Sequence, residues 1–338
     1  TKVYRLLRRG ANVNARDEMG WTALMHAVSY ANGRKLVSVP RYIQLAQLLI
    51  NRGANIHIVG GRVNAFTLSA KYANSTMLRL LARKGANVNI CAPAVNYSAV
   101  QWAAYKGHVY TLQTLISLGA KVTGKGTCGN NALHLAVKFH NRTRIFYYLL
   151  KVRNGININE KNREGNTALI IAAKAGMFRN IAYLLRNGAN VNLQNNKNET
   201  ALMYACYSTN RDYWKKMRVV RLLLKKYPKI NLKDNHGKSA IFYASNLTIV
   251  KLLLHRDNGA SVTLRDNRGR TVLINAVRMG LTGIVRYLIQ FGANVNAKDY
   301  QTYTALDYAL KMPSNLRSPA LINLIKKAGG KTGAQIGS

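Results

Sequence analysis

The chain has 338 residues, of which 48% are hydrophobic, so it can bury a core and is not a disordered basic tail. It carries 51 Lys and Arg residues against 11 Asp and Glu residues, which gives a formal net charge of +40. No apolar run approaches the roughly 18 residues of a membrane span and no signal-peptide pattern opens the chain, so we expect an intracellular protein, in the cytoplasm or nucleus of its own cell or of a host, or inside a virion.

The charge is unevenly distributed along the chain. Residues 19–159 carry 17 Lys and Arg residues and no Asp or Glu. The net charge therefore comes mainly from missing carboxylates, since an ordinary chain contains similar numbers of both signs. A field of one sign favours a polyanionic partner, such as nucleic acid, an anionic membrane or an acidic protein surface.

A repeated pentapeptide sets the organisation of the chain. The chain opens at Thr1 within an expected helix, so we expect further residues upstream. From there Gly-Ala-Asn-Val-Asn, or a variant of it, recurs at intervals of 32 to 43 residues. The copies begin at Gly10, Gly53, Gly85, Gly119, Gly155, Gly188, Tyr227, Gly259 and Gly292, with a decayed copy near Ala328.

Most copies are followed, 12 or 13 residues later, by a Thr, Ser or Asn and then by apolar residues at helical spacing. We interpret the polar residue as an N-cap, whose side chain accepts a hydrogen bond from a free backbone N–H of the first helical turn. An alanine at a fixed position gives this first helix a narrow face that lets its neighbours approach closely. The expected caps are Thr22, Ser98, Asn131, Thr167, Thr200, Ser239, Thr271 and Thr304, and the alanines are Ala27, Ala103, Ala136, Ala172, Ala205, Ala244, Ala276 and Ala309.

A second apolar segment follows each first helix, as at residues 181–185 and 249–254. It ends at the Gly of the next copy, which supplies the left-handed turn after a helix. In the seventh copy Tyr227 and Pro228 replace this Gly, and Pro ends a helix by other means. Each period thus predicts a helix, a turn, a second helix and an extended loop.

This pattern resembles the ankyrin repeat, whose Thr-Pro-Leu-His-x-Ala signature is matched at residues 131–136 as Asn-Ala-Leu-His-Leu-Ala. The resemblance implies an all-α solenoid of stacked helix-turn-helix units with extended loop or β-hairpin connections, in one domain over residues 1–330, and a flexible, Gly-rich tail at 331–338. It also implies a structural hydrogen bond for His134. The departures are the missing Pro, the single His at the fourth position and a degenerate second repeat.

The long copies keep the distance from the Gly to the N-cap, so we expect their extra residues in the turn between the two helices. Repeat one gains residues around 31–41, and repeat six around 208–218. Smaller insertions lie near 151–154 and 312–318.

In proteins that this chain resembles, partners usually lie against the concave face made by the loop tips and the exposed ends of the first helices. At these positions the sequence places cations beside aromatic rings, which suit either an acidic protein surface or single-stranded nucleic acid. The alternative is an ordinary solvated face whose rings support the stack. The candidate partner-binding residues are Trp21, Tyr30, Tyr72, Tyr105, Lys106, Lys138, Phe139, Lys174, Tyr207 and Arg278.

The insertion of repeat six is a second candidate docking site, because it combines cations and large rings within a loop that gains little core. Its candidate residues are Arg211, Tyr213, Trp214, Lys215, Lys216 and Arg218. The alternative is that Trp214 packs on its own repeat.

Signals for catalysis are missing from the sequence. We find no metalloprotease, nucleophile-elbow or kinase motif, and the three widely spaced cysteines suit neither zinc nor disulfides. We therefore expect no enzyme activity, cofactor, metal or small-molecule substrate. The first hypothesis is a scaffold that binds an acidic protein, in a large assembly or as an effector directed at a host. The second is an RNA- or DNA-binding component of a ribonucleoprotein particle or virion, and the third is catalysis by a domain upstream of Thr1.

Overall fold

The structure is a computed structural model. It describes residues 2–31, 39–90, 97–126, 128–138, 143–152, 155–207, 213–255, 257–313 and 317–337. By its internal contacts the chain divides into two compact units, residues 1–164 and 165–338.

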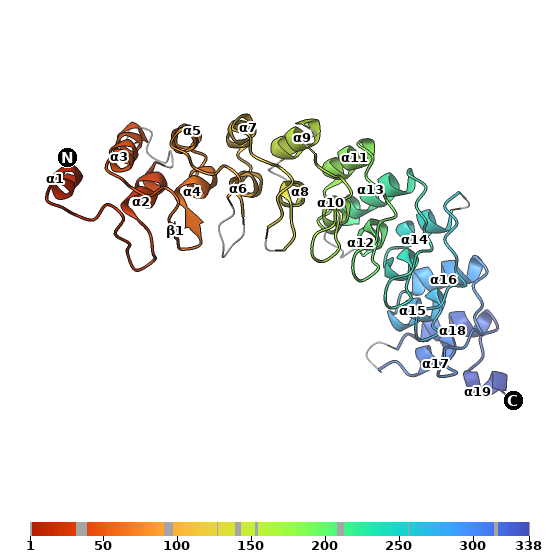
Figure 1. Cartoon of the computed structure of the whole chain (residues 1–338). Coiled ribbons are helices and arrows are strands. Elements are labelled where there is room, and N and C mark those ends of the chain that lie inside the picture. Colours follow the sequence, from red (N-terminus) through yellow and green to blue (C-terminus); the bar gives the residue numbers. More distant parts are fainter. Residues whose placement is uncertain are drawn as a thin grey trace. The chain divides into compact units, whose positions relative to one another are not determined.

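The first unit consists of helix pairs that follow a single helix, α1 (Lys2–Arg8) (Figure 1). The first helices of the pairs lie side by side in one row, and the second helices lie in another. The first row contains α2 (Ala23–Tyr30), α4 (Ala65–Lys71), α6 (Ala99–Lys106) and α8 (Ala132–Val137). The second row contains α3 (Val39–Asn51), α5 (Ser75–Arg83), α7 (Val109–Ser117) and α9 (Thr143–Val152).

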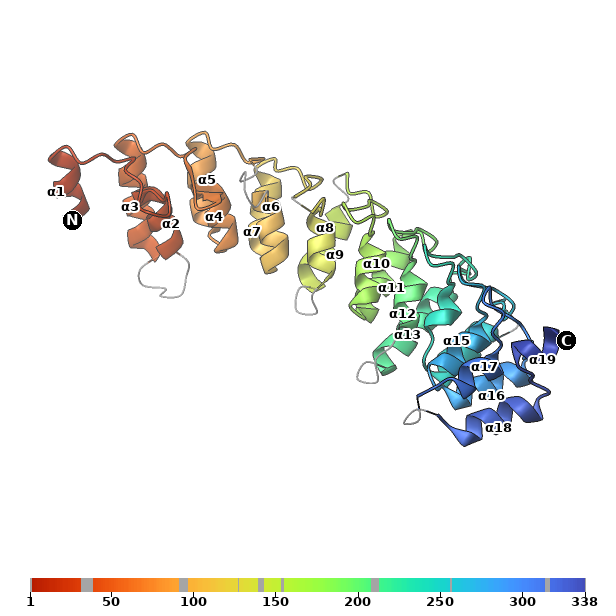
Figure 2. The ribbon, with the colours of Figure 1, turned by 90° about the horizontal axis from the view of Figure 1, so that it is seen from below.

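The second unit also contains a row of first helices and a row of second helices, each helix in contact with the next one of its row. Figure 2 shows the helices of this unit from below. Its first row contains α10 (Ala168–Lys174), α12 (Ala201–Cys206), the 3₁₀ helix η4 (Ala240–Tyr243), α15 (Val272–Arg278) and α17 (Ala305–Leu310). Its second row contains α11 (Phe178–Arg186), α13 (Tyr213–Leu224), α14 (Leu247–Leu254), α16 (Thr282–Gln290) and α18 (Pro319–Lys327). The predicted all-α solenoid of stacked helix pairs is confirmed.

The connections between pairs are extended loops closed by a few strand-like contacts. β1 (Val59–Gly60) and β2 (Val63–Asn64) form an antiparallel pair before α4, with Val59 opposite Asn64 and Gly60 opposite Val63. Isolated bridges close three other loops, as between Arg265 and Thr271. Each of these loops therefore ends directly at the N-cap residue of a first helix.

The predicted caps begin the first helices, with one exception. The side chains of Thr22, Ser98, Asn131, Thr167, Thr200, Thr271 and Thr304 each accept from a backbone N–H three residues later. Ser239 makes no such bond, and its buried Oγ has no partner. The helix that follows Ser239 is the 3₁₀ helix η4, so the cap and the α-helix are lost together.

The alanine column packs the rows together. Ala27, Ala103, Ala136, Ala172, Ala205 and Ala276 are each at most 4% exposed. Second helices end as predicted at a Gly in the left-handed region, such as Gly188 with φ of 87°. Tyr227 occupies the same place in the seventh copy with φ of 47°, a conformation that costs a residue with a Cβ about 1 kcal/mol or more.

The two large insertions differ from the expected loops. In repeat six, Tyr213 to Arg218 form the first part of α13, because the buried Met217 and Val220 extend its apolar side toward the N-terminus. In repeat one, α3 already begins at Val39. Residues 32–38 and 208–212 lie outside the described part of the chain.

The end of the chain also differs from the expected flexible tail. Residues Gly333–Gly337 form a short helix, α19, against repeat nine. The N–H of Gly333 donates to Asp307 Oδ2 at 2.7 Å, and Thr304 Oγ1 donates to the carbonyl of Lys331 at 2.7 Å. These bonds hold the Gly-rich segment onto α17.

Candidate functional site: the first-helix face

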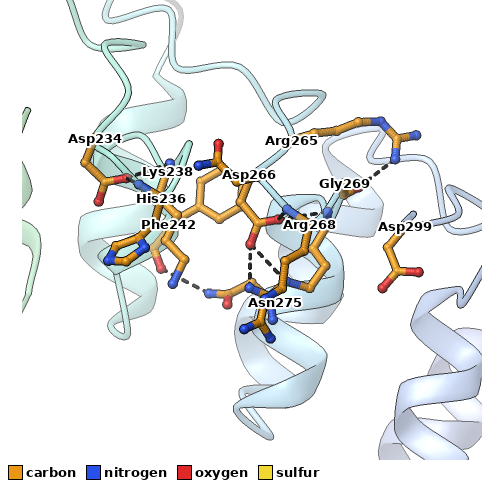
Figure 3. Close-up of polar contacts among 12 residues, drawn as sticks. Asp234, His236, Lys238, Phe242, Arg265, Asp266, Arg268, Gly269, Asn275 and Asp299 are labelled. Atoms are coloured by element: carbon orange, nitrogen blue, oxygen red, sulfur yellow. Dashed lines mark hydrogen bonds and ion pairs between the residues drawn. The ribbon is translucent and has the colours of Figure 1, made fainter. Parts of the chain in front are cut away.

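Four aspartates shape the loops that precede first helices. In Figure 3, Asp266 Oδ1 accepts from the backbone N–H of Arg268 at 2.9 Å and of Arg270 at 3.0 Å. The same pattern, with acceptance from residues two and four positions later, occurs at Asp17, Asp234 and Asp299. Each carboxylate therefore stabilises the turn of its loop by accepting two backbone hydrogen bonds.

The second oxygen of each loop aspartate reaches a side chain of the same repeat. Asp17 Oδ2 lies 2.7 Å from His26 Nε2, and Asp299 Oδ2 accepts from the Tyr308 hydroxyl at 2.7 Å. Asp234 Oδ2 accepts from the Tyr243 hydroxyl, and Asp266 pairs with Arg270 at 2.7 Å in a nearly buried ion pair. Burial alone would raise the pKa of Asp266, but the bonds from Arg270 and the loop N–H groups lower it overall.

Most of the other acids that the structure describes also have structural partners. Glu160 pairs with Lys125 at 2.8 Å and accepts from Asn131, which is itself the cap of α8. Glu199 accepts from Asn195 and Tyr204, and Asp307 caps α17. Most of the described acids thus lie in loops or at helix N-termini, where they accept structural hydrogen bonds.

His134 makes the structural hydrogen bonds that the sequence analysis expects. His134 Nδ1 accepts from the N–H of Asn131, and its Nε2 lies 3.0 Å from the carbonyl of Glu160 in the next loop. The ring thus joins two consecutive repeats. Its role is structural.

We call the surface made by the exposed ends of the first helices and the adjoining loops the first-helix face. On it, cations of one repeat lie over rings of the next. Lys71 Nζ is 5.0 Å from the Trp102 ring centroid, Lys174 Nζ is 5.3 Å from that of Tyr204, and the Arg278 guanidinium is 5.4 Å from that of Tyr308. Each cation stands seven positions after a cap and each ring four positions after the next cap. The spacing is therefore a repeated feature of the stack.

The predicted partner-binding residues fall into three groups. Exposed side chains are Tyr30, Lys106, Lys138, Lys174, Tyr207 and Arg278. Half-buried side chains are Trp21, Tyr72 and Tyr105, and Phe139 lies outside the described residues. Each unit thus brings several of these residues to its own first-helix face.

Two of the half-buried rings contact other rings of their own repeat. Trp21 lies 5.3 Å from the His26 ring, which stacks on Tyr30, and Tyr105 forms an edge contact with Trp102. The Tyr72 ring centroid lies 5.5 Å from Lys71 Nζ. The exposed cations beside them remain open to solvent.

Lys216, one of the predicted docking residues, is buried in the structure. Its side chain is 8% exposed, and its Nζ donates to the carbonyls of Ala173 at 3.0 Å, Lys174 at 3.2 Å and Tyr204 at 3.2 Å. The ammonium group thus lies at the end of α10, where the helix dipole favours a cation, and also bonds a carbonyl of α12. The sequence could not show this, because the contact joins residues about 42 positions apart.

The other repeat-six candidates whose side chains the structure describes are exposed. Trp214 is 70% exposed, Lys215 is exposed, and the Arg218 guanidinium lies 4.0 Å from the centroid of the Phe178 ring. Arg211 and the side chain of Tyr213 lie outside the described residues. These side chains project from the start of α13 rather than from a loop.

The sequence analysis missed a hollow on the first-helix face of the second unit. It has a volume of about 200 Å³ and is lined by Glu199, Met203, Tyr204, Tyr207 and Tyr243. Only Tyr207 was a candidate. The sequence signal that could have revealed the hollow is the small number of residues between the cap Ser239 and the second helix of repeat seven, compared with the other repeats.

Within the described residues, every helix is too short or too polar to cross a bilayer. The same part of the chain contains no group of three or more His, Cys, Asp or Glu side chains placed to hold a metal ion.

Comparisons with known protein families give matches over most of the chain. The model described as "Ankyrin repeats (3 copies)" matches residues 121–195, 180–266 and 242–329, and the model described as "Ankyrin repeat" matches residues 19–60. The ankyrin repeat domain of Bcl-3, described as a unique member of the IkappaB protein family, is a similar solved structure. It has a TM-score of 0.56 and 24% identity over 70% of this chain and 99% of that one, which shows the same fold.

Three curated proteins are similar in sequence over part of their length. Palmitoyltransferase AKR1 of Lachancea kluyveri is 31% identical over 32% of this chain, and Protein glp-1 of Caenorhabditis elegans is 28% identical over 54%. Putative ankyrin repeat protein FPV031 of Fowlpox virus is 30% identical over 46% of this chain. The matched region covers 15%, 14% and 47% of these three proteins, respectively.

Proposed function

The chain belongs to the ankyrin-repeat family, and we propose that it is a non-enzymatic scaffold that binds an acidic partner protein through the first-helix face. The observation that carries this proposal is the column of exposed cations at the ends of the first helices. The column contains Lys106, Lys138, Lys174, Arg278 and Lys311, and no acid stands at the corresponding positions of the repeats.

The spacing of these cations supports the proposal. Packed helices lie about 8–10 Å apart, which is close to the Debye length of about 8 Å at physiological salt. The fields of cations in adjacent repeats therefore overlap in part. An extended acidic segment would meet positive charge at Lys106 and Lys138 in the first unit, and at Lys174, Arg278 and Lys311 in the second.

The rings favour a protein partner over single-stranded nucleic acid. Sequence-tolerant nucleic-acid binding uses open ring faces on which bases stack. On the first-helix face, Trp102, Tyr204 and Tyr308 instead have a cation of the preceding repeat over the ring. Nucleic-acid binding is therefore the second candidate, supported by the charge alone.

The test compares two variants of the whole chain that change net charge equally. In the first, Lys106, Lys138, Lys174 and Arg278 are all changed to Glu. In the control, four exposed arginines of second helices, Arg79, Arg144, Arg179 and Arg286, are changed to Glu. Binding of labelled poly-L-glutamate and of an oligo(dT) is measured for each by fluorescence anisotropy across a salt series.

The proposal expects the first variant to bind poly-L-glutamate at least about tenfold more weakly than the control, with unchanged helical circular dichroism. Equal losses in the two variants would contradict it, because net charge alone would then explain binding. A slope of log K against log salt of about −6 for oligo(dT), as expected for about 8 neutralised phosphates of a single strand, would favour the nucleic-acid candidate.

A further inference from the structure

Repeat seven lacks one turn of its first helix. Leu247, the start of α14, follows Ser239 by 8 positions, whereas the second helix of repeat eight follows its cap, Thr271, by 11. The missing residues correspond to about one helical turn. As a result, η4 has 4 residues where α15 has 7.

Two contacts fix the shortened repeat in place. The backbone of Tyr207 forms an antiparallel bridge with Ala244, immediately after η4. The carbonyl of Phe242, which has no continuing α-helix to donate to it, accepts from Asn275 Nδ2 of the next repeat at 3.1 Å (Figure 3). These two contacts therefore hold the backbone on both sides of the missing turn in place.

The hollow defined above lies at this shortened repeat. Tyr207, which forms the bridge to Ala244, and Tyr243, which precedes Ala244, both line the hollow, together with Met203 and Tyr204 of α12. Its volume of about 200 Å³ exceeds the roughly 150 Å³ of an apolar cavity known to hold benzene. One aromatic or large aliphatic side chain fits this space.

The lining is apolar because its polar atoms already have partners. The Tyr204 hydroxyl donates to Glu199 Oε2 at 2.7 Å, and the Tyr243 hydroxyl donates to Asp234. Burial, and then the bond to Asp234, raise the pKa of Tyr243 far above its ordinary value. The ring therefore stays neutral at physiological pH, and rings and the Met203 side chain make up most of the wall.

Two ammonium groups and two carboxylates border the hollow. Lys174 Nζ lies 5.3 Å from the Tyr204 ring centroid, and Lys238 Nζ lies 5.6 Å from that of Tyr243. The carboxylate of Glu199 accepts from Asn195 and Tyr204, and that of the buried Asp234 accepts from Tyr243 and two backbone N–H groups. Because Lys174 is exposed, carboxylates of a partner that flank an apolar side chain would be attracted by its ammonium group.

We propose that the hollow beside the shortened repeat seven binds one apolar side chain of an acidic partner segment, with Lys174 and Lys238 contacting the carboxylates on either side of it. This rests on the proposed function and makes it more specific. The occupant is an aromatic or large aliphatic residue within an acidic sequence.

The experiment uses the full chain and three labelled oligoglutamate peptides that differ only in the central residue, which is Phe, Ala or Lys. Dissociation constants are measured for the unchanged chain, for Tyr207→Ala, which removes one wall, and for Tyr110→Ala. Tyr110 is 80% exposed on the second helix α7 and serves as the matched control.

The proposal expects the Phe peptide to bind about tenfold more tightly than the Ala peptide, as partial burial of one aromatic ring provides. Tyr207→Ala should bring this ratio close to one while leaving the Ala peptide's affinity unchanged, and Tyr110→Ala should preserve the ratio. Lys174→Glu should weaken the Phe and Ala peptides together.

Other results would overturn the proposal in distinguishable ways. Equal binding of the Phe and Ala peptides, with weakening by Lys174→Glu, would reject the hollow but keep the acidic partner. Preference for the Lys peptide would assign the rings to cation recognition. Absence of binding by all three peptides would reject both the hollow and the proposed function.

Discussion

The ammonium group of Lys216 joins the ends of α10 and α12 through three backbone carbonyls. Replacement by Met keeps the apolar stem but removes the donor to the Lys174 and Tyr204 carbonyls, whereas the Ala173 carbonyl still accepts from the N–H of Gly176. Each unsatisfied buried group costs about 1–3 kcal/mol, so we expect Lys216→Met to lower the unfolding midpoint clearly. The neighbouring Lys215→Met should change stability by only about 0.5 kcal/mol. Equal midpoints for the two variants would contradict the bridging role.

Asp266 makes stability depend on pH in a known direction. Its pKa lies below that of an ordinary Asp carboxyl, so its contribution is fully present above the ordinary pKa and is lost as pH falls through the lower folded-state pKa. Asp266→Asn leaves the nearly buried Arg270 unpaired and should cost about 3 kcal/mol or more near pH 7. Urea unfolding between pH 7 and about 3 should show the difference from the unchanged chain shrinking below about pH 4. A difference that stays constant over this range would be inconsistent with a charged Asp266.

Substitution of Trp214 distinguishes a docking role from a packing role at the start of α13. Because its ring is 70% exposed, Trp214→Ala should leave the melting temperature nearly unchanged. We expect weaker binding of poly-L-glutamate, measured by anisotropy, if the start of α13 contributes to the partner surface. A large drop in melting temperature would show that the ring belongs to the core.

At the residue level, the sequence predicted roles that depend on local spacing. The cap of Thr271 follows from its neighbours within the repeat, whereas the hydrogen bond of His134 was implied by the resemblance to the ankyrin signature. Lys216 could not be assigned this way, since its cationic neighbours resemble an exposed patch and its partners lie about 42 residues away. The loop role of Asp266 was likewise missed, although the Asp recurs five positions before several caps.

Among the elements, the end of α13 carries a strained turn. Tyr227 has φ of 47° and is 83% exposed, so its side chain contributes little packing there. Tyr227→Gly should therefore stabilise the chain by about 1 kcal/mol, because Gly adopts this conformation without a Cβ clash. Chemical denaturation should show a higher midpoint, and Tyr300→Gly, at another exposed tyrosine, should not raise it. A lower midpoint for Tyr227→Gly would show that the ring stabilises the turn.

The elements themselves were largely predictable, because caps and left-handed glycines mark helix ends locally. Predicting the N-terminal extension of α13 required recognising that Met217 is buried, which depends on packing between repeats. The reduction of repeat seven to η4 required comparing the cap-to-helix distance at Ser239 with that of its neighbours. The hollow follows from that reduction and could not be read from any single motif.

For the whole molecule, the charge balance and the fold have one common explanation. Stacked repeats place the same helical position on the same face of each unit, so a residue preference at that position becomes a surface property. Acids are retained in loops and caps, as at Asp266 and Asp307, while the ends of first helices carry Lys and Arg. The positive net charge follows from the composition alone. That the acids lie in loops and caps, apart from the Lys and Arg residues at the ends of first helices, could be seen only in the structure.

The central claim is that an acidic partner lies along the first-helix face. Hydrogen–deuterium exchange of the full chain, with and without saturating poly-L-glutamate, tests this claim directly. We predict slower exchange in peptides that contain the ends of α6, α10 and α15, with little change in the second helices α7, α11 and α16. Protection confined to the second helices, or none at any helix of either row, would contradict the account.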